Sequence, residues 1–231
     1  MLIIELFNGV FFGMIAIFIV VFTLLSILAR KKGELFARKL LGWMMVCTMV
    51  FFFVYKYGLS IDEEYSVLCA EAGIGAFSWW KELPFQLCNI NMIMIPIAML
   101  TMKRPLLNFC FFTGTLGALF ALIMPCTGFS GYSILLLRIL GYYGTHLMVF
   151  FGAVAIVSFG IHKPQFKEIP LTALLLLAVA FGVFIINWLS EPRGSMNMPT
   201  ISSCMIQREI RYWRSSIQLF RIRSCMRYLV C

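Results

Sequence analysis

Hydrophobic residues fill most of the first 190 positions in six long runs, and short polar segments separate these runs. A helix needs about 20 apolar residues to cross a hydrocarbon core about 30 Å thick. Backbone groups in lipid must be hydrogen-bonded within their own segment, which favours helices over open strands. The pattern therefore predicts an all-α, polytopic transmembrane helix bundle with six spans in this chain. The predicted spans cover about residues 8–29, 40–59, 85–102, 106–125, 138–161 and 169–189.

Charged residues between the runs differ in sign from one loop to the next. Basic residues follow the first, third and fifth runs, whereas acidic residues concentrate in the segment 61–83. Because cytoplasmic loops carry an excess of Lys and Arg, we expect a multi-pass protein of the cell membrane with an extracytoplasmic N-terminus. Lys56 and Arg138 lie near the outer ends of spans, and we expect both side chains to extend to the interface. Segment 126–137 is expected to be re-entrant or interfacial.

The composition excludes an ordinary soluble domain. The chain is 61% hydrophobic and 13% charged, whereas soluble domains have about 45–50% apolar and about 25% charged residues. The net charge of +9 comes without an aromatic and basic groove, so we predict no binding of nucleic acid. Eight cysteines and two histidines form no CxxC pair or short-spaced cluster, so we predict no metal site and no cofactor.

The last part of the chain differs in character from the rest. We divide the chain into a six-helix membrane domain, 1–190, and a basic, non-spanning tail, 191–231. The tail holds seven arginines and two glutamates, and an arginine at a helix centre in lipid costs at least about 2.5 kcal/mol. Our hypothesis is that a frameshift near residues 190–196 produced this tail. The alternative is a natural amphipathic tail in the cytosol or on the membrane surface.

Polar residues gather at one depth of the predicted bundle. Arg138, Tyr142 and His146 recur every four residues, so they share one helix face. Gly141 and Gly144 allow a neighbouring helix to approach that region closely. Polar groups within a membrane are costly and usually functional, so we predict an outer pocket. Its polar residues are Cys88, Asn89 and Asn91 in the third span, Arg138, Tyr142 and His146 in the fifth, and Asn187 in the sixth.

Cys88 and His146 are a candidate nucleophile and base. A thiolate is the reactive form of cysteine, and a nearby imidazole can generate it. Asn91 or Asn187 can orient the imidazole or donate to an oxyanion. The substrate in such a pocket would be a lipid, contacted by Asn89, Asn91, Arg138, Tyr142 and Asn187.

Each of these residues also has a simpler interpretation. A cysteine in a membrane helix can be an inert small apolar residue. Asparagine and histidine can serve only to join neighbouring helices. Arg138 can be an interfacial anchor.

The chain resembles the YwaF family of bacterial integral membrane proteins over about residues 1–190. The resemblance rests on Glu82-Leu-Pro-Phe-Gln-Leu-Cys88-Asn89, on the run from Gly114 to Pro125, on Arg138 through His146, and on Asn187. That family is distantly similar to eukaryotic transmembrane acyltransferases that remodel ether phospholipids through a cysteine and a histidine. The resemblance implies that Cys88 accepts the acyl chain and that His146 is its partner.

One position departs from the YwaF pattern. The family often has histidine two residues before this cysteine, where the chain has Gln86. Glutamine forms hydrogen bonds but cannot act as a base. The departure therefore weakens any mechanism that needs two histidines.

Three functions remain open from the sequence. The first is phospholipid acyl transfer through Cys88 and His146. The second is a transporter or binding module for a small polar solute, which the lack of an inverted repeat makes less favoured. The third is a non-catalytic membrane scaffold. We expect membrane lipids as partners, and the sequence predicts no oligomeric state.

Overall fold

The computed structural model describes residues 2–71, 79, 87–125 and 129–190, with the backbone alone at 68–71, 87–88, 166 and 186–190. The chain divides into two units, Met1–Val183 and Phe184–Cys231, which are treated separately. The first unit contains nearly all of the described residues. Everything that follows about packing concerns this unit.

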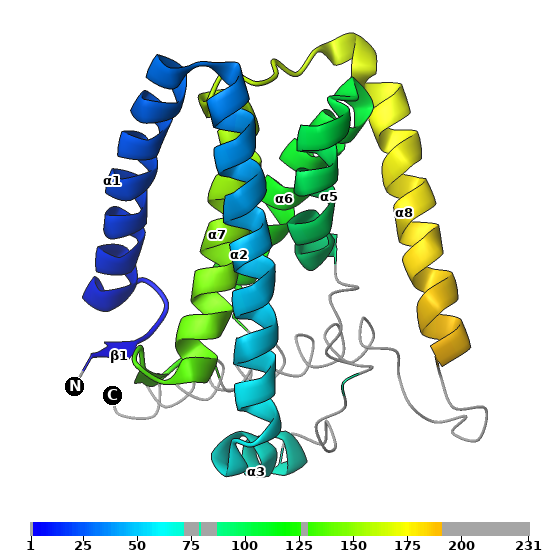
Figure 1. Ribbon diagram of the computed structural model, residues 1–231. Coiled ribbons are helices and arrows are strands. Elements are labelled where there is room, and N and C mark those ends of the chain that lie inside the picture. Colours follow the sequence, from blue (N-terminus) through cyan, green and yellow to red (C-terminus); the bar gives the residue numbers. More distant parts are fainter. Residues whose placement is uncertain (1, 72–78, 80–86, 126–128, 191–231) are drawn as a thin grey trace, which may run out of the picture. The chain divides into compact units, whose positions relative to one another are not determined.

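Long helices dominate the fold, which confirms the predicted all-α class (Figure 1). Each predicted span corresponds to one helix. Helix α2 begins at Glu34, before the predicted start at about residue 40, because its first turns contain polar residues that a hydrophobic run does not include. Four helices, α1, α2, α6 and α7, are long and apolar enough to cross a membrane, and the described parts of α5 and α8 are shorter apolar helices. The helices are α1 (Gly9–Lys32), α2 (Glu34–Ser60), α5 (Leu87–Thr101), α6 (Arg104–Ile123), α7 (Leu137–Ser158) and α8 (Ile169–Ser190).

The two ends of the bundle differ. The connections α1–α2, α5–α6 and α7–α8 lie at one end, which we call the basic end (Figure 1). The opposite end, which we call the ribbon end, carries the strands β1 (Ile3–Ile4) and β2 (Tyr132–Ser133) and the short helix α3 (Glu63–Glu71). The polar segment 61–83 predicts a loop, whereas residues 63–71 of it form the helix α3.

An antiparallel two-stranded ribbon occupies part of the segment 126–137. Ile3 pairs with Ser133, and the backbone N–H of Gly131 donates to the carbonyl of Ile4 at 2.8 Å. Backbone pairing with the N-terminal strand fixes this part of the chain at Tyr132 and Ser133, and the expected re-entrant or interfacial position of the segment stays a prediction. Ile4 is completely buried by this arrangement.

Arginines at the basic end join helices to one another. The Nε atom of Arg30 donates to the carbonyl of Ser158 at 2.6 Å, and Arg38 donates to the carbonyl of Met99 through Nε and Nη2. These carbonyls lie near the C-termini of α7 and α5, where unsatisfied acceptors attract cations. The basic loops therefore have a structural role in addition to any effect on orientation.

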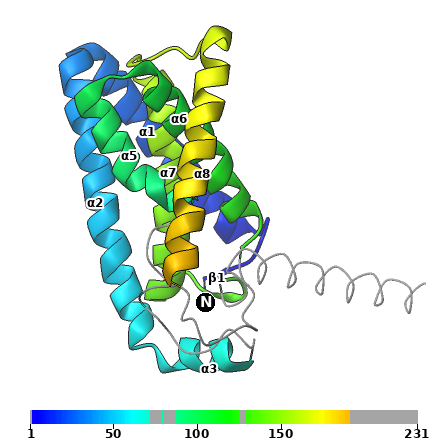
Figure 2. The same cartoon turned by 90° about the vertical axis from the view of Figure 1, so that its right-hand side faces the viewer.

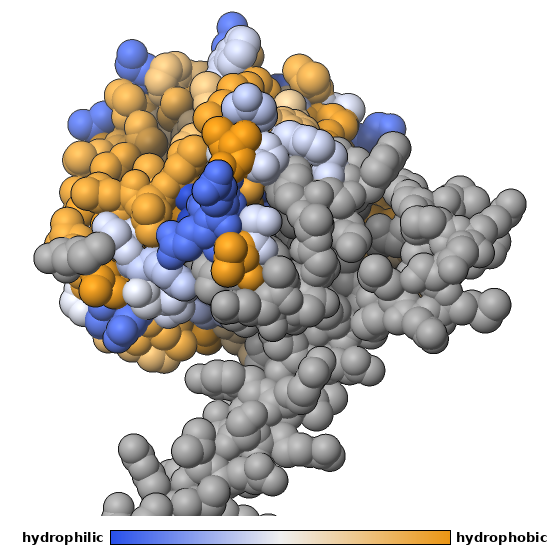
Figure 3. All heavy atoms as spheres, turned by 90° about the horizontal axis from the view of Figure 1, so that it is seen from below, coloured by the Kyte–Doolittle hydropathy of each residue, from blue (hydrophilic) through white to orange (hydrophobic). Residues whose placement is uncertain are grey.

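Helix α7 lies among α1, α2, α5 and α6 (Figures 1 and 2). Its apolar span is 72% buried inside the protein, against 11% for α1. Glycines permit this: a Cβ at Gly141 would collide with the ring of Tyr55 on α2, as predicted for a close approach. Where described residues are visible from the ribbon end, hydrophilic patches lie among hydrophobic residues (Figure 3).

Candidate functional site

His146 lies inside the bundle, in the half of α7 nearer to the ribbon end. Its side chain is buried, with 7% of the residue exposed. Its Nδ1 lies 2.7 Å from the carbonyl oxygen of Tyr142, one turn earlier. The two rings are also in contact, with centroids 4.5 Å apart. The predicted four-residue spacing thus brings these two side chains together.

Tyr142 fixes the surroundings of the histidine. Its hydroxyl donates to the carbonyl of Ala121 on α6 at 2.7 Å. Its ring stacks on Phe129, with centroids 4.6 Å apart, and the ring of Tyr65 on α3 also contacts Phe129. Tyr142 therefore links α7 to α6 and to the segments that cover the ribbon end.

Arg138 is buried at the ribbon end of α7, with 1% of the residue exposed. Its guanidinium pairs with Asp62 at 3.3 Å and with Glu64 at 3.1 Å, and it lies 4.4 Å from the ring centre of Tyr132. The side chain reaches toward the ribbon end, where protein groups surround it. Its observed partners connect α7 to α3 and to the ribbon.

The asparagines of α5 are also inside the bundle. Asn91 is fully buried and donates through Nδ2 to the hydroxyl of Thr113 on α6 at 3.0 Å. Thr113 in turn donates to the carbonyl of Phe109. Asn89 is 6% exposed. The Asn91 contact joins two helices, which is the simpler interpretation of an intramembrane asparagine.

Three positions discussed from the sequence are described by the backbone alone or lie outside the described residues. Cys88 lies in the first turn of α5 and Asn187 in the last turns of α8, and only their backbones are described. Gln86 lies outside the described residues. The predicted meeting of the Cys88 sulfur and the His146 ring stays a prediction.

Lys56 is a polar residue whose place the sequence analysis misjudged. The expectation that it extends to the interface is wrong, because the residue is 9% exposed and its ammonium lies over the rings of Tyr55 and Phe52, 4.8 and 5.4 Å from their centres. Both rings precede Lys56, so the side chain points toward the middle of the bundle.

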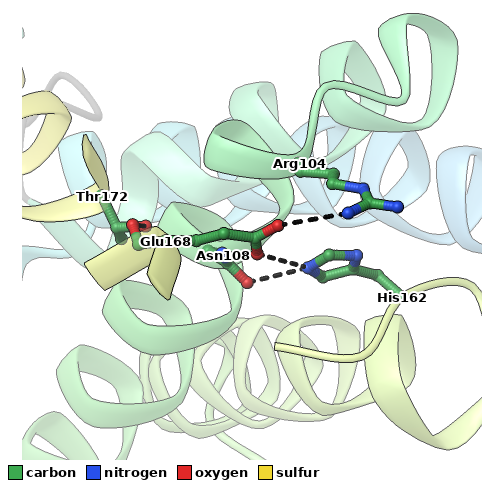
Figure 4. Close-up of polar contacts among 5 residues, drawn as sticks. All are labelled: Arg104, Asn108, His162, Glu168 and Thr172. Carbon is green, nitrogen blue, oxygen red and sulfur yellow. Dashed lines mark hydrogen bonds and ion pairs between the residues drawn. The ribbon is translucent and has the colours of Figure 1, made fainter. Parts of the chain in front are cut away.

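A second polar cluster, at the basic end, was not predicted (Figure 4). Asn108 of α6 donates to Glu168 at 2.6 Å and accepts from Nε2 of His162 at 2.8 Å. Arg104 pairs with the other oxygen of Glu168 at 3.6 Å. The i, i+4 spacing of Arg104 and Asn108 at the start of an apolar span was the available signal.

The described residues offer hydrogen bonding, a buried imidazole and a buried ammonium in one half of the bundle. Within the described ranges, no group of three or more His, Cys, Asp or Glu side chains lies together in a way that could hold a metal ion. This chemistry suits proton transfer and binding of an anion or carbonyl group.

Long apolar helices around a buried polar interior define an integral membrane protein of the all-α class. The TMEM164 family model matches residues 6–222, and the chain belongs to this family of membrane proteins. No curated protein and no solved structure matches the chain. The match continues beyond residue 190 into the basic tail, and the division at residue 190 and the frameshift both stay predictions.

Proposed function

We propose that this protein transfers acyl chains on phospholipids, with Cys88 as the nucleophile and His146 as its base. Membership of the TMEM164 family supports a membrane function. The resemblance to the YwaF family, and through it to cysteine-dependent phospholipid acyltransferases, supports the reaction. Membrane lipids are then both the surroundings and the substrates of the protein.

The observation that carries this proposal is the hydrogen bond at Nδ1 of His146. A carbonyl oxygen can only accept, so the 2.7 Å contact with Tyr142 requires a hydrogen on Nδ1. In the neutral ring the lone pair is then on Nε2, which makes Nε2 the basic nitrogen. A buried, oriented imidazole of this kind is what a nucleophilic cysteine needs as a partner.

The proposed reaction has two halves. His146 takes the proton of the Cys88 thiol, and the thiolate attacks the ester carbonyl carbon of a phospholipid. The carbon–oxygen bond breaks, the departing glycerol oxygen takes the proton from His146, and a thioester remains on Cys88. A hydroxyl group of an acceptor lysophospholipid then attacks the thioester with the same proton transfers in reverse.

The other predicted residues contact or position the lipid in this proposal. Asn91, held by Thr113, has a fixed amide near the ribbon-end half of α5. Tyr142 orients the histidine through its carbonyl. Asn89, Arg138 and Asn187 are proposed to contact the lipid. At Arg138 the contact would be with a lipid headgroup, next to Asp62 and Glu64.

Acyl labelling tests the nucleophile. The protein is reconstituted with a phospholipid that carries a radiolabelled acyl chain, and hydroxylamine-sensitive label is mapped to peptides. We expect label on Cys88 that disappears in Cys88→Ala. Cys110→Ala is the matched control, because Cys110 is a buried cysteine on α6 and should leave the label unchanged.

A histidine pair tests the base. His146→Gln should slow labelling about 100-fold, the usual effect of removing a general base. His162→Gln, at the basic end, should not slow it. Absence of label on Cys88 in folded protein would overturn the proposal. Solute uptake that survives Cys88→Ser and fails in Asn187→Leu would instead favour a transporter, and variants that change stability alone would favour a scaffold.

The proposal includes the orientation in the cell membrane. Lys and Arg cluster in the basic-end connections, so the ribbon end with the N-terminus would lie outside the cell. Ser130 at the ribbon end and Lys163 at the basic end are both exposed. In intact cells, a membrane-impermeant maleimide should label Ser130→Cys above the parental background and should not label Lys163→Cys. The reverse labelling would contradict this orientation.

A further inference from the structure

Lys56 carries a positive charge into the same half of the bundle as His146. The residue is 9% exposed, and its ammonium lies over two rings that precede it in α2, Tyr55 and Phe52. A lysine near a membrane interface ordinarily extends outward to water. The ammonium of Lys56 instead lies back over the rings of its own helix, inside the bundle.

The packing of α2 against α7 gives the depth of this ammonium. Gly58 faces Leu137 and Gly141 faces Tyr55, so the helices run antiparallel with these pairs at equal levels. Because the ammonium lies beside the Tyr55 and Phe52 rings, it is level with the α7 turn that begins at Gly141. His146 follows on the next turn of α7.

A charge at this depth is costly, and such residues generally mark functional sites. A cation above an aromatic ring is stabilised when it is desolvated, and this offsets part of the cost of burying a lysine in a membrane helix. The two rings therefore help to hold the ammonium in place, and its direction suits a site that develops negative charge.

We propose that Lys56 is a catalytic residue whose ammonium stabilises the oxyanion formed during acyl transfer, an inference that rests on the proposed function. When the thiolate attacks the ester carbonyl, the carbon–sulfur bond forms and the carbonyl electron pair moves to oxygen. The ammonium donates a hydrogen bond to that oxygen. When the carbonyl re-forms, the glycerol oxygen leaves with the proton from His146, and Lys56 keeps its own protons.

Kinetics with reconstituted protein test this role. Lys56→Met keeps the unbranched stem but removes the charge, so kcat should fall about 100-fold, as for loss of one oxyanion donor, with KM nearly unchanged. Lys56→Arg should retain most of kcat. Lys39→Gln is the control, since Lys39 is an exposed lysine at the start of α2. Thermal unfolding of each variant is measured, and Lys56→Gln replaces Lys56→Met if the latter does not fold.

Alkylation of Cys88 by iodoacetamide gives a readout that needs no acyl transfer. A cation beside a thiol increases the thiolate fraction, so the pH profile of Cys88 alkylation should move to higher pH in Lys56→Met and stay near that of the wild type in Lys56→Arg. The protein could transfer no acyl chain and still show a shifted pH profile of alkylation. That result would support a cation beside the Cys88 thiol and would contradict only the proposed function. Unchanged kcat, an unchanged profile, or losses that follow stability alone would overturn the role of Lys56.

Discussion

Asn108 donates through Nδ2 to Oε2 of Glu168 at 2.6 Å and so fixes the short 3-10 helix η1 (Phe166–Glu168) against the start of α6. The other amide atom of Asn108, Oδ1, accepts from His162. Asn108 is itself 1% exposed. One buried amide therefore satisfies two titratable side chains from the connection between α7 and α8.

This cluster makes stability depend on pH. Burial lowers the pKa of His162 below its usual 6.5, and the hydrogen bond from Asn108 lowers the pKa of Glu168 below its usual 4.5. Both depressed values contribute stability that is complete above the ordinary pKa and is lost as the pH falls. We expect the unfolding temperature in detergent to begin to fall below about pH 6.5 and to fall further below about pH 4.5.

Two substitutions separate these contributions. His162→Gln can still donate to Asn108 but cannot titrate, so it should remove the part of the pH dependence that begins near pH 6.5. Glu168→Gln should remove the part below pH 4.5. If both variants follow the wild-type curve, other groups control the acid sensitivity.

The contact between α2 and α7 predicts opposite effects at two nearby glycines. A methyl group at Gly141 would collide with the Tyr55 ring close to its backbone, whereas a methyl group at Gly144 would lie 3.4 Å from Phe51 Cε1 at the end of a side chain. Gly141→Ala should lower the free energy of unfolding by about 1–3 kcal/mol. Gly144→Ala should be neutral or stabilising, because alanine has the better helix propensity. Equal effects in thermal unfolding would contradict the described register.

Arg138 should hold α3 in place. Its removal in Arg138→Gln leaves two carboxylates without their cation, so we expect a loss of more than about 1 kcal/mol and faster proteolysis in the segment around α3. Glu64→Gln tests the Arg138–Glu64 ion pair alone, which we expect to be the weaker of the two pairs. The Glu64 side chain is 58% exposed, and its loss should cost less than about 1 kcal/mol. Proteolysis that is the same in both variants would count against this anchoring role.

The N-terminal strand provides a pair of adjacent isoleucines with different burial. Ile4 is completely buried, whereas Ile3 is 37% exposed. Ile4→Ala should lower the free energy of unfolding by about 2–5 kcal/mol, and Ile3→Ala by roughly 0.5 kcal/mol or less. Thermal unfolding in detergent measures both. Similar values for the two variants would contradict the different burial of these isoleucines.

The long helices were predictable because span length is set by the thickness of the hydrocarbon core, and the apolar runs have that length. The close approach at Gly141 was also predictable, because small residues in membrane helices often mark positions where a neighbouring helix packs closely. The contact between Tyr142 and His146 follows from helix periodicity alone. These features depend on residues that are near one another in sequence.

The remaining features depend on residues that are far apart in sequence. The ribbon uses two residues from each strand, too few to show an alternating pattern. The direction of the Lys56 side chain depends on the positions of the Tyr55 and Phe52 rings. Asn108 gains its two partners only when the segment that contains His162 and Glu168 packs against α6. The charged residues in the loops predict an orientation in the membrane, which stays a prediction, but they do not predict which side chains pair with one another.

The ribbon also limits the order in which the protein can assemble during synthesis. Ile3 pairs with Ser133, so the amino terminus cannot dock until translation has passed the start of α7. Among the described helices, α1 packs mainly against α2 and α7, and α7 is synthesised much later than α1 and α2. Until α7 is inserted, α1 can therefore pack against α2 alone, and the packing of α1 is complete only after α7 has entered the bilayer.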